Sequence, residues 1–346
     1  MGIVVRATDL GADRALLIQV LRRYLTPLSD ERRFDWLYRQ SPHGHARAWL
    51  AVDENNGETV GAAALFPRRM HAKGIEIAGC VLGDFCMHPS YRSLGPALQL
   101  QRACLMELES GAWELGYDFP SAGMAAVYRR LGVEPREQIV RWAKPLRVDR
   151  RIAQRIRMRL LARGLSAVGN HLLELQDSKL VRRMQWTISL HEGACQEEFS
   201  VLAREVSAGY GLCVERTAKY LNWRYLAHPI RHHQILTARQ NGSLSGYLVF
   251  TQSGLDARIV ELFGIPQEEM LKSLVAGAAK LLRERGVMTL SAPMGVSHPW
   301  VPLLRSLGFR PRESTPVILL RTARFRAAAE AIPGRGWLLM DGDRDS

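Results

Sequence analysis

Residues 92–97 have the types and the spacing of a loop that binds an anion. In order they are Arg92, Ser93, Leu94, Gly95, Pro96 and Ala97. They follow a strand-like apolar segment and lead into a helical one, and such a turn exposes backbone N–H groups that, with the helix dipole, attract negative charge. Gly95 lets a ligand approach the backbone closely, and Arg92 can add a charge-assisted hydrogen bond. Pro96 has no N–H but suits the first turn of a helix. The loop therefore predicts a phosphate site.

Two motifs that could position this loop occur twice along the chain. The pattern R-x-L-G-x-x-P-R-E spans residues 129–137 and returns 176 residues later at 305–313. Upstream, W-x-Y-x-x-x-P spans 36–42 and returns 187 residues later at 223–229. Each upstream motif precedes two strand-like segments joined by Asn-Gly, a dipeptide typical of tight hairpin turns. Landmarks repeated in the same order predict one fold made twice.

The periodicity of the apolar residues predicts the elements of each unit. In the first unit we expect strands at 3–7, 48–52, 59–66, 77–87, 117–119 and 139–146 and helices at 12–25, 34–39, 96–110 and 122–131. In the second we expect helices at 196–208, 218–226, 268–285 and 300–307 and strands at 234–238, 244–251, 258–263, 287–291 and 317–321. This order predicts an α/β fold, with a mixed sheet covered by helices, in each unit.

The run from Asp84 to Ala97 resembles the acyl-CoA binding motif of the GNAT superfamily of N-acyltransferases. In that family a strand ends in a loop of the form (Q/R)-x-x-G-x-(G/A) that opens a long helix, and residues 92–97 match this form. The resemblance implies two tandem GNAT-like folds and acetyl-CoA or another acyl-CoA as co-substrate. It also implies that residues 92–97 hold the pyrophosphate and that the strand backbone at Phe85, Cys86 and Met87 pairs with the pantetheine arm.

The same resemblance suggests catalytic residues. The family often has N-x-x-A-x-x-x-Y in the helix that follows, and here Ser121 stands at the Asn position and Tyr128 at the Tyr position. By resemblance, Ser121 contacts the cofactor and the Tyr128 phenol protonates the departing thiolate. The plain alternative is that Tyr128 packs against the sheet.

A proton acceptor is also needed, because an amine must be neutral before it attacks. Asp84 is the first candidate, with a structural carboxylate as the alternative, and His88 is the second. The pairs His43/His45 and His232/His233 lack metal-ligand spacing, so no metal site is expected.

The second unit has no counterpart of the loop. Residues 264–270 contain no basic residue and no spaced glycine, and their acids Glu268 and Glu269 would repel pyrophosphate. We expect this unit to be a non-catalytic partner that shapes the acceptor site. Trp223, Arg224 and Tyr225 are candidates to line that cleft, and the alternative for Trp223 and Tyr225 is a place in the core.

Positive charge is concentrated between the two units. The whole chain carries +13, and residues 144–183 hold eleven Lys and Arg but only three acids, a balance of +8. Apolar residues alternate with these arginines, which is typical of an amphipathic helix. A helix of this kind fits a docked interdomain helix or an anionic membrane surface.

These observations predict four segments. Residues 1–147 form a GNAT domain with the acyl-CoA loop, 148–184 a basic helical linker, 185–325 a degenerate GNAT-like domain and 326–346 a tail. The five cysteines form no C-x-x-C pair, which favours a reducing compartment. Arg6 precedes any long apolar run, so the N-terminus does not read as a signal peptide and we expect a cytoplasmic protein.

Three classes of function fit the sequence. The first is an acyl-CoA-dependent N-acyltransferase acting on the amine of a small molecule or amino sugar, and the likeness to tandem GNAT proteins implies surface polysaccharide biosynthesis as a candidate pathway. The second is a Fem-type transferase that uses aminoacyl-tRNA and has no need of the loop at 92–97. The third is a non-catalytic GNAT-like binding module. We expect a small-molecule acceptor and no nucleic-acid partner.

Overall fold

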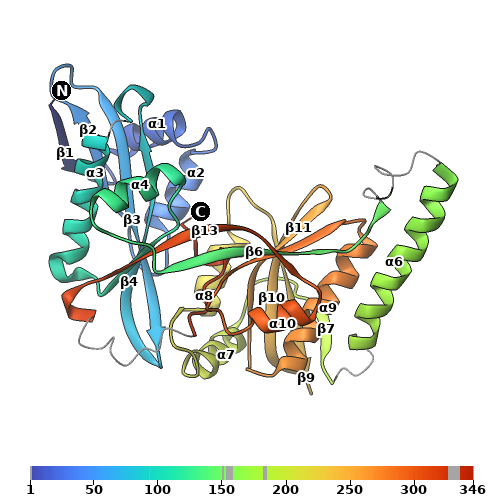
Figure 1. Ribbon diagram of the computed structural model, residues 1–346. Coiled ribbons are helices and arrows are strands. Elements are labelled where there is room, and N and C mark those ends of the chain that lie inside the picture. The colour runs from blue at the N-terminus through green and yellow to red at the C-terminus, as the bar shows by residue number, and fades with distance from the viewer. Residues whose placement is uncertain are drawn as a thin grey trace.

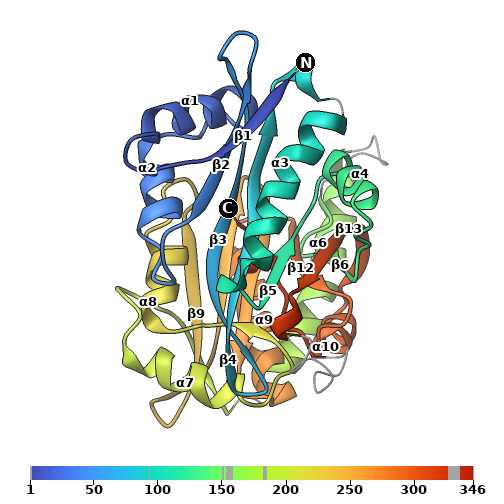
Figure 2. The same cartoon turned by 90° about the vertical axis from the view of Figure 1, so that its left-hand side faces the viewer.

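The computed structural model describes residues 2–92, 94–149, 152, 159–181, 185–325 and 336–345. Two halves lie side by side, and two long strands cross between them (Figure 1). The predicted mixed α/β architecture is confirmed: thirteen strands are named in the described residues, twelve of them in one continuous path, with helices on both faces (Figure 2).

The elements of the first half agree with the expected order. They are β1 (Ile3–Ala7), α1 (Arg14–Tyr24), α2 (Glu31–Phe34) with the π-helical turn η1 (Asp35–Arg39), β2 (Arg47–Asp53), β3 (Thr59–Ala72), β4 (Ile75–Met87), η2 (Pro89–Tyr91), α3 (Leu94–Glu107) with η3 (Leu108–Ala112), β5 (Leu115–Asp118), α4 (Ala122–Arg130) and β6 (Glu137–Pro145). Strands β3 and β4 are longer than expected, because a tight turn at Lys73-Gly74, both with positive φ, joins them into one long hairpin.

The second half repeats this order. After α6 (Arg159–Val181) come β7 (Thr187–Leu190), α7 (Glu197–Ser207), β8 (Cys213–Val214), α8 (Ala218–Leu221) with the π-helical turn η4 (Asn222–Leu226), β9 (His233–Gln240), β10 (Ser243–Ser253), β11 (Asp256–Gly264), α9 (Glu268–Glu284), β12 (Thr289–Gly295), α10 (Val301–Ser306), β13 (Arg310–Arg321) and η5 (Asp341–Asp343). The short strands β7 and β8 were not expected from the sequence.

Turns and helix ends explain the repeated motifs. In the second hairpin Asn241 and Gly242 both adopt positive φ, as expected for Asn-Gly, whereas in the first only Gly57 does. The nine-residue repeat places Gly132 after α4 and Gly308 after α10, both with positive φ. Glycine adopts this conformation without strain and so ends each helix before the last strand of its half.

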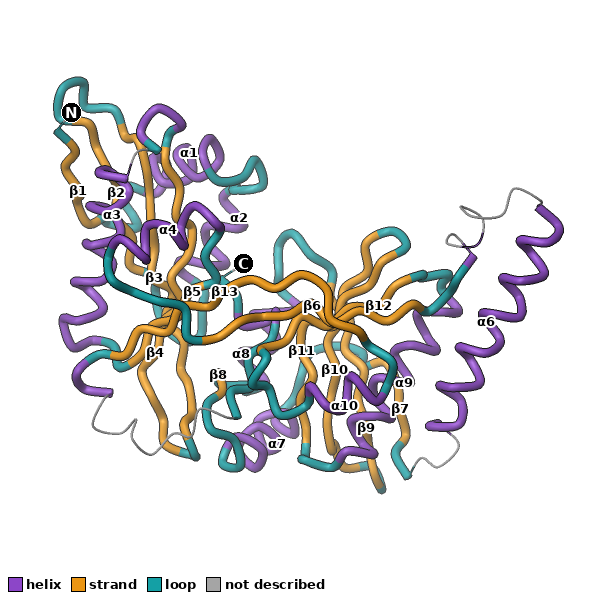
Figure 3. Tube along the Cα trace, viewed as in Figure 1, coloured by secondary structure: helices purple, strands orange, loops and turns teal. Residues whose placement is uncertain are grey.

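The halves exchange their last strands. The sheet order is β1-β2-β3-β4-β5-β13-β6-β12-β11-β10-β9-β7. Counted inward from the two ends, each strand of the first half has its counterpart from the second half at the same position. Strand β13 pairs with β5 of the first half, and β6 pairs with β12 of the second. The two exchanged strands also pair with each other along the centre (Figure 3). Each half thus completes its sheet with a strand of the other, while the boundaries near 147 and 185 stay a prediction.

Candidate active site

Strands β4 and β5 part from each other in the middle of the first half. They pair in parallel only over Gly79–Val81 and Leu115–Tyr117, and beyond Val81 the two strands diverge. A register shift between β3 and β4 at Ala62/Ala64 lies beside the opening, and Asp84 there has a φ of 48°. The opening leaves an edge of β4 backbone that β5 does not cover, so an extended ligand could pair with it.

A cavity of about 440 Å³ lies at this opening. Its lining includes six of the predicted cofactor residues: Phe85, Cys86, Met87, Arg92, Ala97 and Ser121. The predicted proton acceptor Asp84 also borders it, whereas Leu94, Gly95 and Pro96 are not among the lining residues. Two other cavities, of about 800 and 900 Å³, are larger but border neither the opening nor the loop at 92–97. We therefore place the candidate site at the smaller cavity.

The first turn of α3 forms one end of this site. The helix begins at Leu94, so Pro96 stands in its first turn, where a missing N–H costs no intrahelical bond. Gly95 is exposed, and a Cβ placed on it would meet no atom within 4 Å. Arg92 is exposed as well, and its Nε donates to the Met87 carbonyl at 3.3 Å. An anion can approach this helix end freely, while Ser93 lies outside the described residues.

Asp84 is held by a buried ion pair. Its carboxylate accepts two hydrogen bonds from Arg33, at 2.5 and 2.8 Å, and a third from the Tyr38 hydroxyl at 2.8 Å. The Arg33 and Asp84 side chains are only 4% and 1% exposed. These three hydrogen bonds engage both carboxylate oxygens and tie Asp84 to its buried neighbours. The geometry therefore favours a structural role for Asp84 over its role as proton acceptor, the two alternatives that the sequence left open.

Tyr128 reaches the cavity only through its neighbours. Its side chain is fully buried, and its hydroxyl donates to Asp118 at 2.8 Å and accepts from Gln101 at 3.0 Å. Asp118 and Gln101 both line the cavity, whereas Tyr128 is not among the lining residues. Burial raises the pKa of Asp118 to about 7 and the pKa of Tyr128 well above its usual value. Asp118 is thus a cavity carboxyl that changes protonation near neutral pH.

Ser121 and His88 both cap local structure. The Ser121 hydroxyl accepts from the Met124 N–H at 3.3 Å and so begins helix α4. The Nδ1 of His88 accepts from the Ser90 N–H at 3.1 Å, which fixes the turn η2. Neither role prevents a ligand contact, and a catalytic role for His88 stays a prediction.

A segment from the far end of the chain reaches the same cavity. Asp345 borders it and accepts from the Asp84 backbone N–H at 3.3 Å. Buried side chains fix the three residues before Asp345. Arg216 forms an ion pair with Asp343 at 2.6 Å, and Tyr117 donates to the Asp343 carbonyl at 2.9 Å. Arg224 donates to the carbonyls of Gly342 and Arg344, both at 2.9 Å. Burial and the charge of Asp84 raise the pKa of Asp345. Sequence reasoning missed Asp345 because nothing in a tail sequence indicates where it folds.

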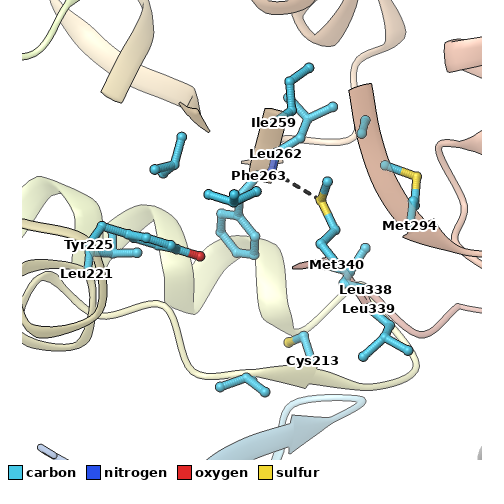
Figure 4. Packing of buried hydrophobic residues seen from close by; sticks show 14 of the residues in the cluster. Cys213, Leu221, Tyr225, Ile259, Leu262, Phe263, Met294, Leu338, Leu339 and Met340 are labelled. Atoms are coloured by element: carbon cyan, nitrogen blue, oxygen red, sulfur yellow. Dashed lines mark hydrogen bonds between the residues drawn. The ribbon is translucent and has the colours of Figure 1, made fainter. Parts of the chain in front are cut away.

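The corresponding opening in the second half is partly occupied by the chain itself. Strands β11 and β12 pair in parallel only over Asp256–Arg258 and Thr289–Ser291 and then part. Met340 forms a bridge with Met294 and accepts from the Leu262 N–H through its sulfur at 3.2 Å (Figure 4). Met340 thus contacts both parted strands, and the preceding residues Leu338 and Leu339 are buried in the same core (Figure 4). The tail therefore occupies part of this opening, and the cavity of about 900 Å³ that Val260, Ser291 and Asp341 line lies beside it.

The three residues proposed to line an acceptor cleft lie in the core. Trp223 stacks on Trp36, Arg224 binds the tail carbonyls, and the Tyr225 hydroxyl donates to Glu261 at 2.8 Å. All three are buried. The core alternative, which the sequence left open for Trp223 and Tyr225, describes the environment of all three.

A match to a protein-family model identifies a domain in the first half of the chain. The family model of the GNAT acetyltransferase domain matches residues 14–136, the part of the chain that contains the parted strands, the cavity and the loop at 92–97. Residues 14–136 are therefore identified as a GNAT acetyltransferase domain. No curated protein sequence matches the chain.

Solved structures share the GNAT fold over nearly the whole chain. A probable N-acyltransferase from Enterococcus faecalis V583 is 13% identical with a TM-score of 0.66, covering 93% of this chain and 72% of its own. GCN5-related N-acetyltransferases from Anabaena variabilis (14%, TM-score 0.66, 91% and 72%) and Kribbella flavida (15%, TM-score 0.64, 95% and 74%) are similar. At these identities the likeness establishes the fold alone. Together with the family match it supports an acyltransferase.

Proposed function

We propose that this protein is an acyl-CoA-dependent N-acyltransferase, in the simplest case an N-acetyltransferase, that acts on the amine of a small molecule or amino sugar. The observation behind the proposal is one cavity that Arg92 and Ala97 of the loop border at the start of α3 and that continues to the opening between β4 and β5. The shape suits a ligand with an anionic end and a narrow arm.

The residues present fit acyl-CoA as co-substrate. The open approach at Gly95, the N–H groups of the first turn of α3 and the exposed Arg92 would hold the pyrophosphate. The edge of β4 from Phe85 to Met87 would pair with the amides of the pantetheine arm. The thioester would then lie at the inner end of the cavity, near Asp118 and Asp345.

Two carboxyl groups there suit the proton transfers of the reaction. The amine nitrogen attacks the thioester carbonyl carbon, the C–N bond forms, the C–S bond breaks, and the nitrogen loses a proton while the sulfur gains one. We assign the acceptance of the amine proton to Asp345. We assign the protonation of the sulfur to Asp118, whose pKa near 7 lets it carry a proton at neutral pH, with Tyr128 as its positioning residue.

The ionised carboxylate of Asp345, the proposed proton acceptor, also favours a positively charged acceptor. An ammonium group is attracted to a cavity bordered by acids and is deprotonated there before it attacks. We propose to test amino sugars of surface polysaccharides first among such acceptors. The second half, whose own opening is partly occupied by the tail, would act as a partner that holds the tail and Asp345 in place.

Release of free coenzyme A tests the proposal. Purified protein is mixed with acetyl-CoA and a panel of amines and amino sugars, and the liberated thiol is measured. We expect thiol release that depends on an acceptor and falls at least tenfold in Arg92→Ala, since a charge-assisted phosphate contact is lost. Acceptor-independent release, or none with any amine despite binding of acetyl-CoA, would overturn the assignment as a transferase of this kind.

A further inference from the structure

Helix α6 (Arg159–Val181) exposes a row of apolar side chains. Leu161, Leu165, Val168 and Leu175 are 52%, 46%, 60% and 41% exposed. Their spacing of four, three and seven residues places them on one face of the helix. We call these four residues the outer row. A single exposed leucine needs no explanation, but four apolar side chains on one helix face indicate a surface that contacts another molecule or a membrane.

The opposite face of α6 holds the helix in this orientation. Helix α6 packs along α9, and Ser166 is buried. Asn170 accepts from the Val148 N–H at 2.9 Å and donates to Asp149, while a Cβ on Gly169 would lie 2.7 Å from Val148. These contacts determine which face of α6 points inward, and the exposed outer row lies on the other face. The helix itself lies at the edge of the molecule (Figure 1).

Basic residues flank the outer row at both ends of its segment. Residues 150–163 contain six arginines and no acid, and residues 179–183 contain one lysine and two arginines and no acid. Between them, residues 164–178 contain neither lysine nor arginine. In sequence, the stretch that carries most of the outer row and the acids Glu174 and Asp177 therefore stands between two positively charged stretches. An amphipathic helix bordered in sequence by basic residues suits the boundary between the acyl chains and the anionic headgroups of a lipid layer.

We propose that α6 docks the protein on an anionic lipid surface through the outer row. Charge complementarity favours this occupant, because residues 144–183 carry +8 and a second copy of the chain would bring two such segments together. Nucleic acid would satisfy the charge but leave the outer row in water. The helix would lie in the surface, since none in the described residues has the length and apolarity to cross a bilayer. The inference does not depend on the acyl transfer proposed above.

Sedimentation with lipid vesicles tests the proposal. The full chain is mixed with phosphatidylcholine vesicles that either contain or lack phosphatidylglycerol. We expect binding to the anionic vesicles, weaker binding in high salt, and a roughly tenfold or greater loss in Leu165→Ser/Val168→Ser, because two apolar side chains no longer enter the lipid. Leu255→Ser removes an equally exposed apolar residue from the turn between β10 and β11, outside α6, and should bind as the wild type does.

Other outcomes would overturn the proposal. One is the absence of vesicle binding, and another is equal binding by the wild type and the double variant. A third is self-association in sedimentation velocity that the double variant abolishes while vesicles have no effect, which would assign the outer row to a second copy. Thermal unfolding of each variant confirms that it is folded, and both altered positions are exposed, so unfolding is not expected.

Discussion

The indole N–H of Trp36 donates to the carbonyl of Trp223 at 2.8 Å, and the indole N–H of Trp223 donates to the carbonyl of Trp36 at the same distance. Their rings stack with centroids 5.1 Å apart. Each tryptophan lies in the π-helical turn of its half, η1 and η4, so the repeated W-x-Y motif is where the halves meet. The exchange of strands and this exchange of hydrogen bonds join the halves into one unit.

Trp36→Phe should destabilise the protein by about 1–3 kcal/mol, because it removes the indole N–H and leaves the buried Trp223 carbonyl without its hydrogen bond. Urea unfolding measures the change. Trp113→Phe is the matched control, since the Trp113 indole N–H has no hydrogen-bond partner among the described residues. Equal losses in the two variants would mean that ring packing, and not the exchanged hydrogen bonds, joins the halves.

Asp84→Asn should lower the free energy of unfolding by about 3–5 kcal/mol, because it leaves Arg33 buried without its anion. Chemical denaturation is the measurement. Asp13→Asn, which breaks the partly exposed pair with Arg6, should have little effect. If Asp84→Asn kept wild-type stability and lost only turnover, Asp84 would be a proton acceptor after all.

The buried Asp118 should make stability depend on pH. Its pKa in the folded protein is about 7, above the 3.8 of an ordinary aspartate, so its protonated form favours folding. That contribution is complete below about pH 4 and is lost as the pH rises to about 7. Relative to Asp118→Asn, the wild type should lose a few kcal/mol across this window. Unfolding curves recorded at several pH values test this, and a constant difference between the two proteins would contradict it.

Met340→Ala should destabilise the protein by about 2–5 kcal/mol, because it opens a cavity between the parted strands of the second half. Met106→Ala, at a side chain that is 73% exposed, serves as control and should change stability little. Thermal unfolding compares them. A tail that merely lies on the surface would tolerate both changes equally well.

Local sequence patterns predicted much of the fold. Apolar periodicity and Asn-Gly turns predicted most elements, and glycines in the nine-residue repeat predicted two helix ends that the structure confirms at Gly132 and Gly308. The exchange of β6 and β13 could not be foreseen, because either strand could have completed either sheet by its own pattern.

The site was predicted only where a sequence motif marks it. The loop at 92–97 is recognisable by its spacing, and its neighbours on β4 follow from it. The partner of Asp84 lies 51 residues away at Arg33, and Asp345 comes from 261 residues beyond Asp84. Asp118 looks like any aspartate in sequence, since its raised pKa arises from burial in the folded chain. Such properties depend on tertiary contacts that no local pattern records.

Calorimetric titration of acetyl-CoA and of a longer acyl-CoA tests the central claim most directly. We predict one site per chain in the wild type and at least tenfold weaker binding in Gly95→Glu, because the new carboxylate would repel the pyrophosphate although its Cβ fits without a clash. Gly164→Glu places the same charge at another helical glycine with open surroundings and should bind as the wild type does. Absence of binding to the folded wild type, or equal binding by Gly95→Glu, would contradict an acyl-CoA site at the opening between β4 and β5.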